Sequence, residues 1–219
     1  IDTAWEKGWI KPLNPPKEIN KSIGIIGSGP AGIAAAEELR KKGYKIEIYD
    51  RYDRSGGLLI YGIPNFKLEK YAVQRRIKIL KEGGIIFHNN FEVGKTKSFN
   101  FLKKKHDALL IATGVYKARE LNFSQENLEG IIPALDFLIA SNKKGLGDKV
   151  PEFDSGKLNS TNKRVVVIGG GDTAMDCVRT AVRQNAKSVT CLYRRNKENM
   201  PGSLREVLHA EEEGINFSW

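Results

Sequence analysis

The sequence contains very little cysteine and no long apolar run. Its 219 residues include two cysteines, Cys177 and Cys191, which are too few and too far apart for a disulfide framework, a zinc site or a Cys-x-x-Cys redox pair. No stretch approaches the roughly 18 apolar residues of a membrane span, and the first segment lacks the apolar centre of a signal peptide. These absences exclude disulfide-stabilised secreted and membrane-spanning classes and predict a cytoplasmic protein without a membrane partner.

Acidic residues are outnumbered by basic ones, 26 to 36, so the formal net charge is +10. This excess is compatible with nucleic acid, an acidic membrane surface or an anionic small molecule as partner. The densest basic cluster lacks the aromatic platform and the recognition motif of nucleic-acid-binding modules. We therefore predict a solvated face and no nucleic-acid partner for Lys95, Lys97, Lys103, Lys104 and Lys105.

The two ends of the chain have the character of excised ends. The chain opens on Ile1, and residues 215–219 alternate like a strand cut before its turn. Dividing the length by about 150 residues per domain gives about one and a half domains. We expect a fold truncated at both ends, with residues 1–21, which contain three prolines, as an extended arm.

One supersecondary design occurs twice. Residues 22–26 predict a strand, 27–32 a glycine turn, 31–42 a helix and 44–49 a second strand. The order repeats with a strand at 164–168, glycines at 169–171, a helix at 173–184 and a strand at 187–193. The fold class is therefore α/β with two Rossmann-like βαβ domains. Between the repeats we expect a loop at 50–66, helices at 68–82 and 99–105, strands at 85–88, 91–93 and 107–112, and an irregular region up to residue 163.

The first glycine turn has the spacing of a dinucleotide-binding motif in its expected context. Gly27 permits the tight turn, Gly29 lets a pyrophosphate approach the backbone, and Gly32 lets the helix lie close to the strand. Asp50 ends the next strand, where a carboxylate can accept hydrogen bonds from ribose hydroxyls. The predicted dinucleotide site comprises Gly27, Ser28, Gly29, Pro30, Ala31, Gly32 and Asp50.

The second turn keeps the glycines but has no acid at the end of its second strand. Arg194 and Arg195 stand there instead, and an arginine pair would bind a 2′-phosphate. This favours NADPH over NADH, the alternative being a solvated basic turn. Asp172 either helps to orient the nicotinamide nucleotide or caps the helix. The predicted NADPH site comprises Gly170, Gly171, Asp172, Thr173, Ala174, Arg194 and Arg195.

Two dinucleotide sites in one chain favour hydride transfer from NADPH to FAD, with the reaction carried by the cofactors rather than by catalytic side chains. We therefore divide the chain into the arm, 1–21; an incomplete FAD domain, 22–135; an interdomain connection, 136–163; and an incomplete NADPH domain, 164–219.

Several runs resemble the small (β) subunit of bacterial glutamate synthase. They are 27–32 with Asp50, the run 55–70, Ala112-Thr113-Gly114, the run 169–177, and 193–195 continuing to 199–203. The resemblance implies an adrenodoxin-reductase-like fold with an NADPH domain inserted into a discontinuous FAD domain. It implies electron transfer from NADPH through FAD and [4Fe-4S] clusters to a large (α) subunit that makes glutamate from glutamine and 2-oxoglutarate. The cluster ligands would lie outside this chain.

The same resemblance implies further flavin contacts. Gly57 and Leu58 would lie along the FAD, Lys67 would contact it, and the Val93 backbone would touch the adenine, with Thr113 and Gly114 also at the site. From the residues alone, Gly57 fits a close backbone approach. Lys67 equally fits a solvated lysine at a helix start, and Val93 a core valine.

Other readings remain open at this point. Related flavin subunits of ferredoxin–NADP or pyrimidine reductases share both glycine turns, although the Trp-containing arm and residues 119–149 resemble glutamate synthase more closely. A non-catalytic nucleotide-sensing module is the alternative of another class, since binding motifs do not prove turnover. A thiol–disulfide reductase is disfavoured because it needs a cysteine pair beside the flavin, and both cysteines read as core residues rather than ligands.

Overall fold

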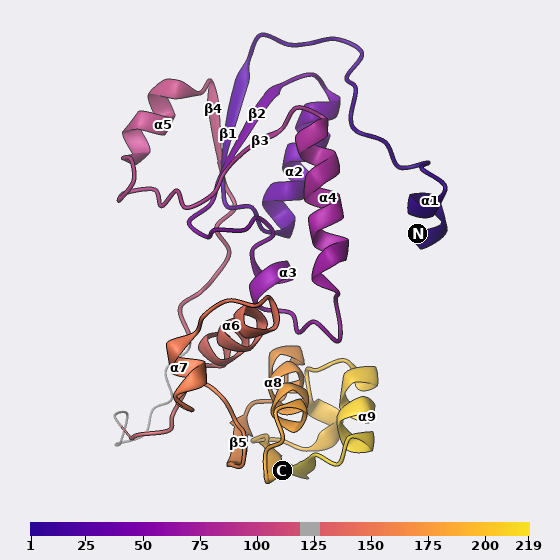
Figure 1. The fold of residues 1–219 in the computed structure, drawn as a ribbon, viewed down its shortest axis with the longest axis vertical. Coiled ribbons are helices and arrows are strands. Elements are labelled where there is room, and N and C mark those ends of the chain that lie inside the picture. Colours follow the sequence, from indigo (N-terminus) through magenta and orange to yellow (C-terminus); the bar gives the residue numbers. More distant parts are fainter. Residues whose placement is uncertain (119–127) are drawn as a thin grey trace. The chain divides into compact units, whose positions relative to one another are not determined.

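The computed structural model describes residues 1–118 and 128–219, which form two compact units (Figure 1). The first unit comprises residues 1–60 and 68–115. The second comprises 61–67 and the residues from 116 onward. The short segment 61–67 therefore packs with residues that lie far from it in the sequence.

The first unit is built on a parallel sheet with the strand order β3-β2-β1-β4. Parallel neighbours need crossover connections, which usually carry helices, and the helices of this unit supply them. The strands are β1 (Ser22–Ile26), β2 (Lys45–Tyr49), β3 (Ile86–His88) and β4 (Ala108–Ile111). The helices are α1 (Asp2–Glu6), α2 (Pro30–Lys41), α3 (Leu58–Tyr61), α4 (Lys70–Glu82) and α5 (Phe99–Lys105), α3 running into the second unit at its last residue.

Helices cover both faces of this sheet. Figure 1 shows α2 and α4 together on one side and α5 on the other. Neighbouring residues of a strand point to opposite faces, so Ile25, fully buried, lies near Gly32 of α2, whereas Ile26 and Tyr49 pack against Leu102 of α5. Burial on both faces fits the apolar sequence of the central strand β1, whereas the edge strand β4 is mostly exposed.

The second unit has a three-stranded parallel sheet in the order β5-β6-β7. One apolar cluster joins α8, α9 and β6, with Met175 and Val178 fully buried at its centre. The strands are β5 (Arg164–Ile168), β6 (Ser188–Leu192) and β7 (Asn216–Ser218). The helices are α6 (Ala134–Gly145), α7 (Pro151–Asp154), α8 (Asp172–Arg183) and α9 (Leu204–Glu212), with a 3₁₀ turn at Lys197–Asn199.

The structure confirms the repeated βαβ design and corrects four local expectations. The strands at 22–26 and 164–168 and the helix at 99–105 have the predicted bounds. The strand at 91–93 is wrong, because only an isolated bridge joins Val93 to Lys97. The loop at 50–66 contains α3, the irregular region contains α6 and α7, and the extended arm begins with the short helix α1.

The boundaries of the two compact units differ from the domain boundaries inferred from sequence, because 61–67 and α6 both belong to the second unit. The assignment of domains to cofactors stays a prediction. Residues 119–127, part of the 119–149 region, lie outside the described residues. Across 1–118 and 128–219, no helix has the length and apolarity needed to cross a bilayer.

Candidate functional site

The first glycine turn joins β1 to α2, and two of its glycines are required by the protein's own backbone. Gly27 has φ +108°, and a Cβ on it would lie 2.4 Å from the Ala112 carbonyl oxygen. A Cβ on Gly32 would lie 2.0 Å from the Gly27 oxygen. No side chain fits at these distances, so both positions fix the turn itself.

Gly29 differs, because a Cβ on it would meet nothing within 4 Å. It is the N-cap of α2, with extended backbone at φ −68° and ψ −179°, a conformation open to any residue. Pro30 and Ala31 beside it are exposed. The first-turn N–H groups and the positive end of the helix dipole therefore face open space, which is the arrangement that binds a phosphate.

Asp50 is buried beside this turn, with 7% of its surface exposed. Its Oδ2 accepts hydrogen bonds from the Ser28 backbone N–H at 2.7 Å and from the Ser28 hydroxyl at 2.5 Å. Its Oδ1 accepts one from the Tyr52 N–H at 2.9 Å. Ser28 is fully buried, so the carboxylate clamps the turn to the end of β2, and its predicted contact with ribose would use its remaining acceptor capacity.

The other predicted flavin residues except Lys67 lie in the first unit, at different depths. Gly57 has φ +54°, and a Cβ on it would lie 2.9 Å from the Gly29 Cα, so these two glycines of the motifs approach each other closely. Leu58 begins α3 and is half-buried. Val93 is half-buried against the apolar cluster of Ile26, Tyr49 and Leu102, and Thr113 and Gly114 follow β4 in exposed positions.

The second turn has the same backbone design with looser packing. The Gly169 N–H donates to the last residue of β6, just as the Gly27 N–H donates to the last residue of β2. A Cβ on Gly169 would lie 3.7 Å from the Ala174 Cβ, an ordinary contact, so alanine is tolerated in the helix here. A Cβ on Gly170 would lie 2.7 Å from the Tyr193 ring, whereas one on Gly171, the N-cap of α8, would meet nothing within 4 Å.

Asp172 does not cap α8, so that alternative is wrong. The N-cap is Gly171, Asp172 is the first helical residue, and no side-chain cap bond forms. Its Oδ1 accepts a hydrogen bond from the Ser203 N–H at 2.9 Å, and Gly202 N–H donates to the Gly170 oxygen at 2.8 Å. Asp172 thus holds the segment before α9 against the glycine turn. Thr173 follows it in an exposed position.

Arg194 and Arg195 follow β6 and are both exposed. Within residues 1–118 and 128–219, neither side chain forms an ion pair or a hydrogen bond. By contrast, Arg179 and Arg183 of α8 are held by carboxylates. An arginine without a carboxylate partner keeps its donors and its charge for an anion.

Lys67 is held by carboxylates of the second unit. Its Nζ is 2.8 Å from Asp176 Oδ1 and 3.1 Å from Glu206 Oε2, and its side chain is 21% exposed. Burial opposes its charge, but the hydrogen bond that it donates to Asp176 and the nearby carboxylates raise the pKa of Lys67. It is therefore a partly buried, paired cation. The reading as a solvated lysine is wrong, and the flavin contact stays a prediction.

Sequence reasoning missed two charge networks. In the second unit, Arg179 donates to Glu206 at 2.7 Å and to Glu213 at 2.8 and 3.0 Å. In the first, Glu47 accepts from Lys105 and pairs with His88, both at 2.6 Å, so Lys105 is not part of a purely solvated face. The available signal in the sequence was the spacing of Arg179 and Arg183, which are four residues apart in α8 and therefore lie on one face of the helix.

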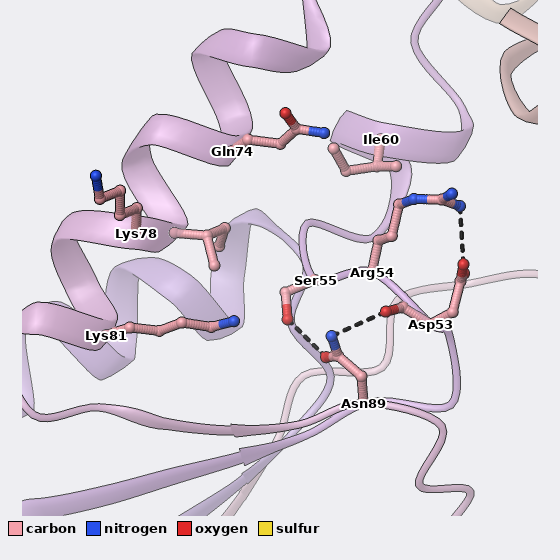
Figure 2. A pocket seen from close by; sticks show the side chains of 9 residues that line it. Asp53, Arg54, Ser55, Ile60, Gln74, Lys78, Lys81 and Asn89 are labelled. Atoms are coloured by element: carbon pink, nitrogen blue, oxygen red, sulfur yellow. Dashed lines mark hydrogen bonds and ion pairs between the residues drawn. The ribbon is translucent and has the colours of Figure 1, made fainter. Parts of the chain in front are cut away.

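A pocket of about 320 Å³ opens beside the loop that follows β2 (Figure 2). Apolar side chains, Ile60 and Ile77, and several polar side chains line it. Among the polar ones, Ser55 Oγ donates a hydrogen bond to Asn89 Oδ1 at 2.7 Å. None of the predicted cofactor residues lines it. The predicted nucleotide sites therefore stay at the open N-termini of α2 and α8 and do not coincide with this pocket.

Both cysteines are buried and free, which confirms that they are core residues. Burial raises the pKa of the Cys177 thiol to about 12 and that of Cys191 to about 11. A thiol reacts as the thiolate, so neither is a reactive group at neutral pH. The described residues contain no group of three or more His, Cys, Asp or Glu side chains placed to hold a metal ion.

Known proteins of similar sequence and fold indicate the family of this chain. It is 61% identical over its full length to the glutamate synthase [NADPH] small chain of Azospirillum brasilense, of which it covers 45%, and 46% identical to that of Escherichia coli, of which it covers 46%. The chain thus spans about half the length of these relatives. Its fold matches Mycobacterium tuberculosis FprA in complex with NADPH with a TM-score of 0.72 at 22% identity, over 91% of this chain and 48% of that one.

The family model for pyridine nucleotide-disulphide oxidoreductase matches residues 21–219 and so covers both glycine turns and both sheets. The chain belongs to the pyridine nucleotide-disulphide oxidoreductase family and is a homologue of the NADPH glutamate synthase small chain.

Proposed function

We propose that this chain forms the cofactor-binding core of the electron-input subunit of a glutamate synthase, with FAD at the first turn and NADPH at the second. Membership of the family implies FAD and NAD(P)H. When bound at these turns, NADPH would supply a hydride that FAD would accept together with its two electrons, leaving NADP⁺, while the residues of the two turns would hold and orient the nucleotides. We further propose that these electrons leave through iron–sulfur clusters outside this chain to a large subunit that makes glutamate from glutamine and 2-oxoglutarate.

One observation carries the proposal. Gly29 and Gly171 are both helix N-caps, both have backbone angles open to any residue, and a Cβ on either would meet nothing within 4 Å. The protein's own packing therefore does not require a glycine at either place. A ligand that must approach the backbone closely does require it.

The residues around each turn fit their proposed nucleotides. At the first turn the Asp50 carboxylate, fixed by Ser28, presents an acceptor to ribose hydroxyls and would repel a 2′-phosphate. At the second turn Arg194 and Arg195 would accept that phosphate. The protein's part is to bind and orient the two nucleotides and to exclude water.

The test uses Gly29→Ala and Gly171→Ala in the natural full-length protein that contains this sequence. Because neither methyl group meets protein atoms, each variant should fold with a loss of at most about 1 kcal/mol, as expected for alanine at an N-cap. Gly29→Ala should lose flavin absorbance, whereas Gly171→Ala should keep the flavin and lose NADPH-dependent reduction of an artificial acceptor.

Gly145→Ala is the matched control, since a Cβ there too would meet nothing within 4 Å and the residue ends α6 and belongs to neither turn. It should leave flavin content and NADPH oxidation unchanged. An unmodified protein that shows no flavin absorbance after reconstitution with FAD would refute the proposal. Nucleotide binding without any turnover would instead support the non-catalytic sensing module.

A further inference from the structure

The segment 61–67, called the strap below, is fixed to the second unit by charges at its end. Lys67 pairs with Asp176 of α8 and Glu206 of α9 at 2.8 and 3.1 Å. The two carboxylate side chains are only 11% and 16% exposed. An ion pair so shielded from water is specific in geometry, because either charge left alone would be poorly solvated.

An aromatic contact strengthens this end of the strap. The guanidinium carbon of Arg183 lies 3.8 Å from the centre of the Phe66 ring, and that of Arg179 lies 4.8 Å from it. Both arginines are themselves held by Glu213, so the ring meets two fixed cations. The strap is therefore joined to α8 through both of its last two residues.

The beginning of the strap is held by a different helix. Asn142 of α6 is buried, and its Nδ2 donates to the carbonyl oxygens of Tyr61 and Gly62 at 3.0 and 3.2 Å. Buried amides that satisfy two carbonyls fix the backbone they contact. The second unit thus holds the strap at both ends.

The strap is also the direct continuation of the first flavin turn along the chain. Only residues 58–60 of α3 separate Gly57 from the strap, because the last residue of this helix, Tyr61, is the first residue of the strap. Gly57 in turn lies against Gly29, with 2.9 Å between its ideal Cβ position and the Gly29 Cα. A displacement of the strap would therefore be carried by one helical turn into the glycines that must accept a pyrophosphate.

We propose that Lys67 is a positioning residue that acts through Asp176 and Glu206: it anchors the strap and so holds the step from Gly57 to Leu58 in the geometry the flavin needs. The inference rests on the proposed function for the flavin itself. It gives Lys67 a role different from direct flavin contact, because the paired ammonium already has two carboxylate partners. Asp176 and Glu206 become determinants of flavin affinity although they belong to the second unit.

The anchor is tested first without flavin, by hydrogen exchange of residues 58–66 in the stripped full-length protein. Lys67→Met and Asp176→Asn should each speed exchange there about tenfold or more, because the strap loses its charged anchor. Lys67→Arg, which keeps the positive charge, should keep the protection. Lys144→Met, which breaks only the exposed pair with Asp154, should change nothing. Unchanged exchange in both single variants would overturn the anchor.

The second measurement is the dissociation constant of FAD in the same variants, beside their melting temperatures. Lys67→Met and Asp176→Asn should both weaken FAD binding about tenfold, and Lys67→Arg should keep most of the affinity. Loss of affinity in Lys67→Met, with Asp176→Asn like the unmodified protein, would show direct flavin contact and overturn the proposal. Faster exchange with unchanged FAD affinity would also overturn it. If the unmodified protein binds no FAD, the proposed function fails while the exchange result still decides the anchor.

Discussion

The two glycine turns share one backbone design but are held together in different ways. At the first, two glycines are required by contacts of 2.0 and 2.4 Å to backbone oxygens, and a buried carboxylate fixes the turn to β2. At the second, an alanine fits in the helix, and a network of arginines and glutamates joins α8 to α9. A glycine turn of this design can therefore be stabilised by close backbone packing or by ion pairs between its helix and a neighbouring helix.

The largest effect on stability is expected at the third position of the glycine motif, which is Gly32 in α2 and Ala174 in α8. Gly32→Ala places a methyl group 2.0 Å from the Gly27 oxygen, and because backbone lies on both sides, the turn itself must open. We expect a loss of about 3 kcal/mol in the free energy of unfolding. Ala174→Gly in the second turn removes a methyl group that makes ordinary contacts and should cost only about 1 kcal/mol.

Urea unfolding of both variants measures this difference. Equal losses at the two positions would show that the turns are packed alike, contrary to the structure. Gly29→Ala serves as the control within the first turn, since its methyl group meets no protein atom.

How far the sequence predicted these turns depends on the range of the interactions. The strands at 22–26 and 164–168 follow from local runs of apolar residues, and the glycine turns from their spacing, so both were predicted to the residue. Lys67 and Asp176 are 109 residues apart, and no periodicity relates residues at that distance. The buried hydrogen bonds of Asp50 to Ser28 are similarly a product of the turn's three-dimensional closure.

The elements between the repeats show a second limit. Residues 115–163 contain scattered glycines and two prolines, which favour loops, yet α6 and α7 form there. Leu138, Ala140 and Asn142 of α6 are buried, and tertiary packing of such side chains outweighs weak local signals. The roles of the individual predicted site residues at the cofactors stay predictions that the experiments above address.

Acid should separate the contributions of ion pairs in the two units. Burial opposes ionisation of Glu213, but hydrogen bonds from Arg183 and Arg179 lower its pKa to about 2; in the first unit, bonds from Lys105, His88 and Tyr49 likewise lower the pKa of Glu47 to about 2. A folded-state pKa below the unfolded one stabilises the protein above the unfolded value of 4.5. This contribution is lost as the pH falls toward about 2.

We therefore expect Glu213→Gln to lower stability at pH 7 and to flatten the decline of stability in acid. The measurement is unfolding of the full-length protein in urea between about pH 3 and pH 7, followed by hydrogen exchange of α8 and α9 in the second unit. Glu198→Gln, at an exposed position, is the control and should leave the acid decline unchanged. A decline in Glu213→Gln as steep as in the unmodified protein would contradict the assigned pKa.

The smallest effect on stability, and the sharpest on selectivity, is expected at Arg194 and Arg195. Both are exposed, and neither has a side-chain partner in the described part of the chain, so the double variant Arg194→Ala with Arg195→Ala should change the free energy of unfolding by no more than about 0.5 kcal/mol. Its kcat/KM for NADPH should fall about 100-fold through loss of charge-assisted bonds to the 2′-phosphate, because each such bond contributes about 1.5 to 3 kcal/mol. The value for NADH should stay within about twofold, since that coenzyme lacks the phosphate.

Arg164→Ala, which replaces an exposed arginine at the other end of β5 from the glycine turn, is the matched control for the loss of positive charge. An equal fall of kcat/KM for NADPH and for NADH would show that the arginines act only through the net positive charge of the protein. The acid after β2 and the arginines after β6 would then not determine which nucleotide binds at each turn.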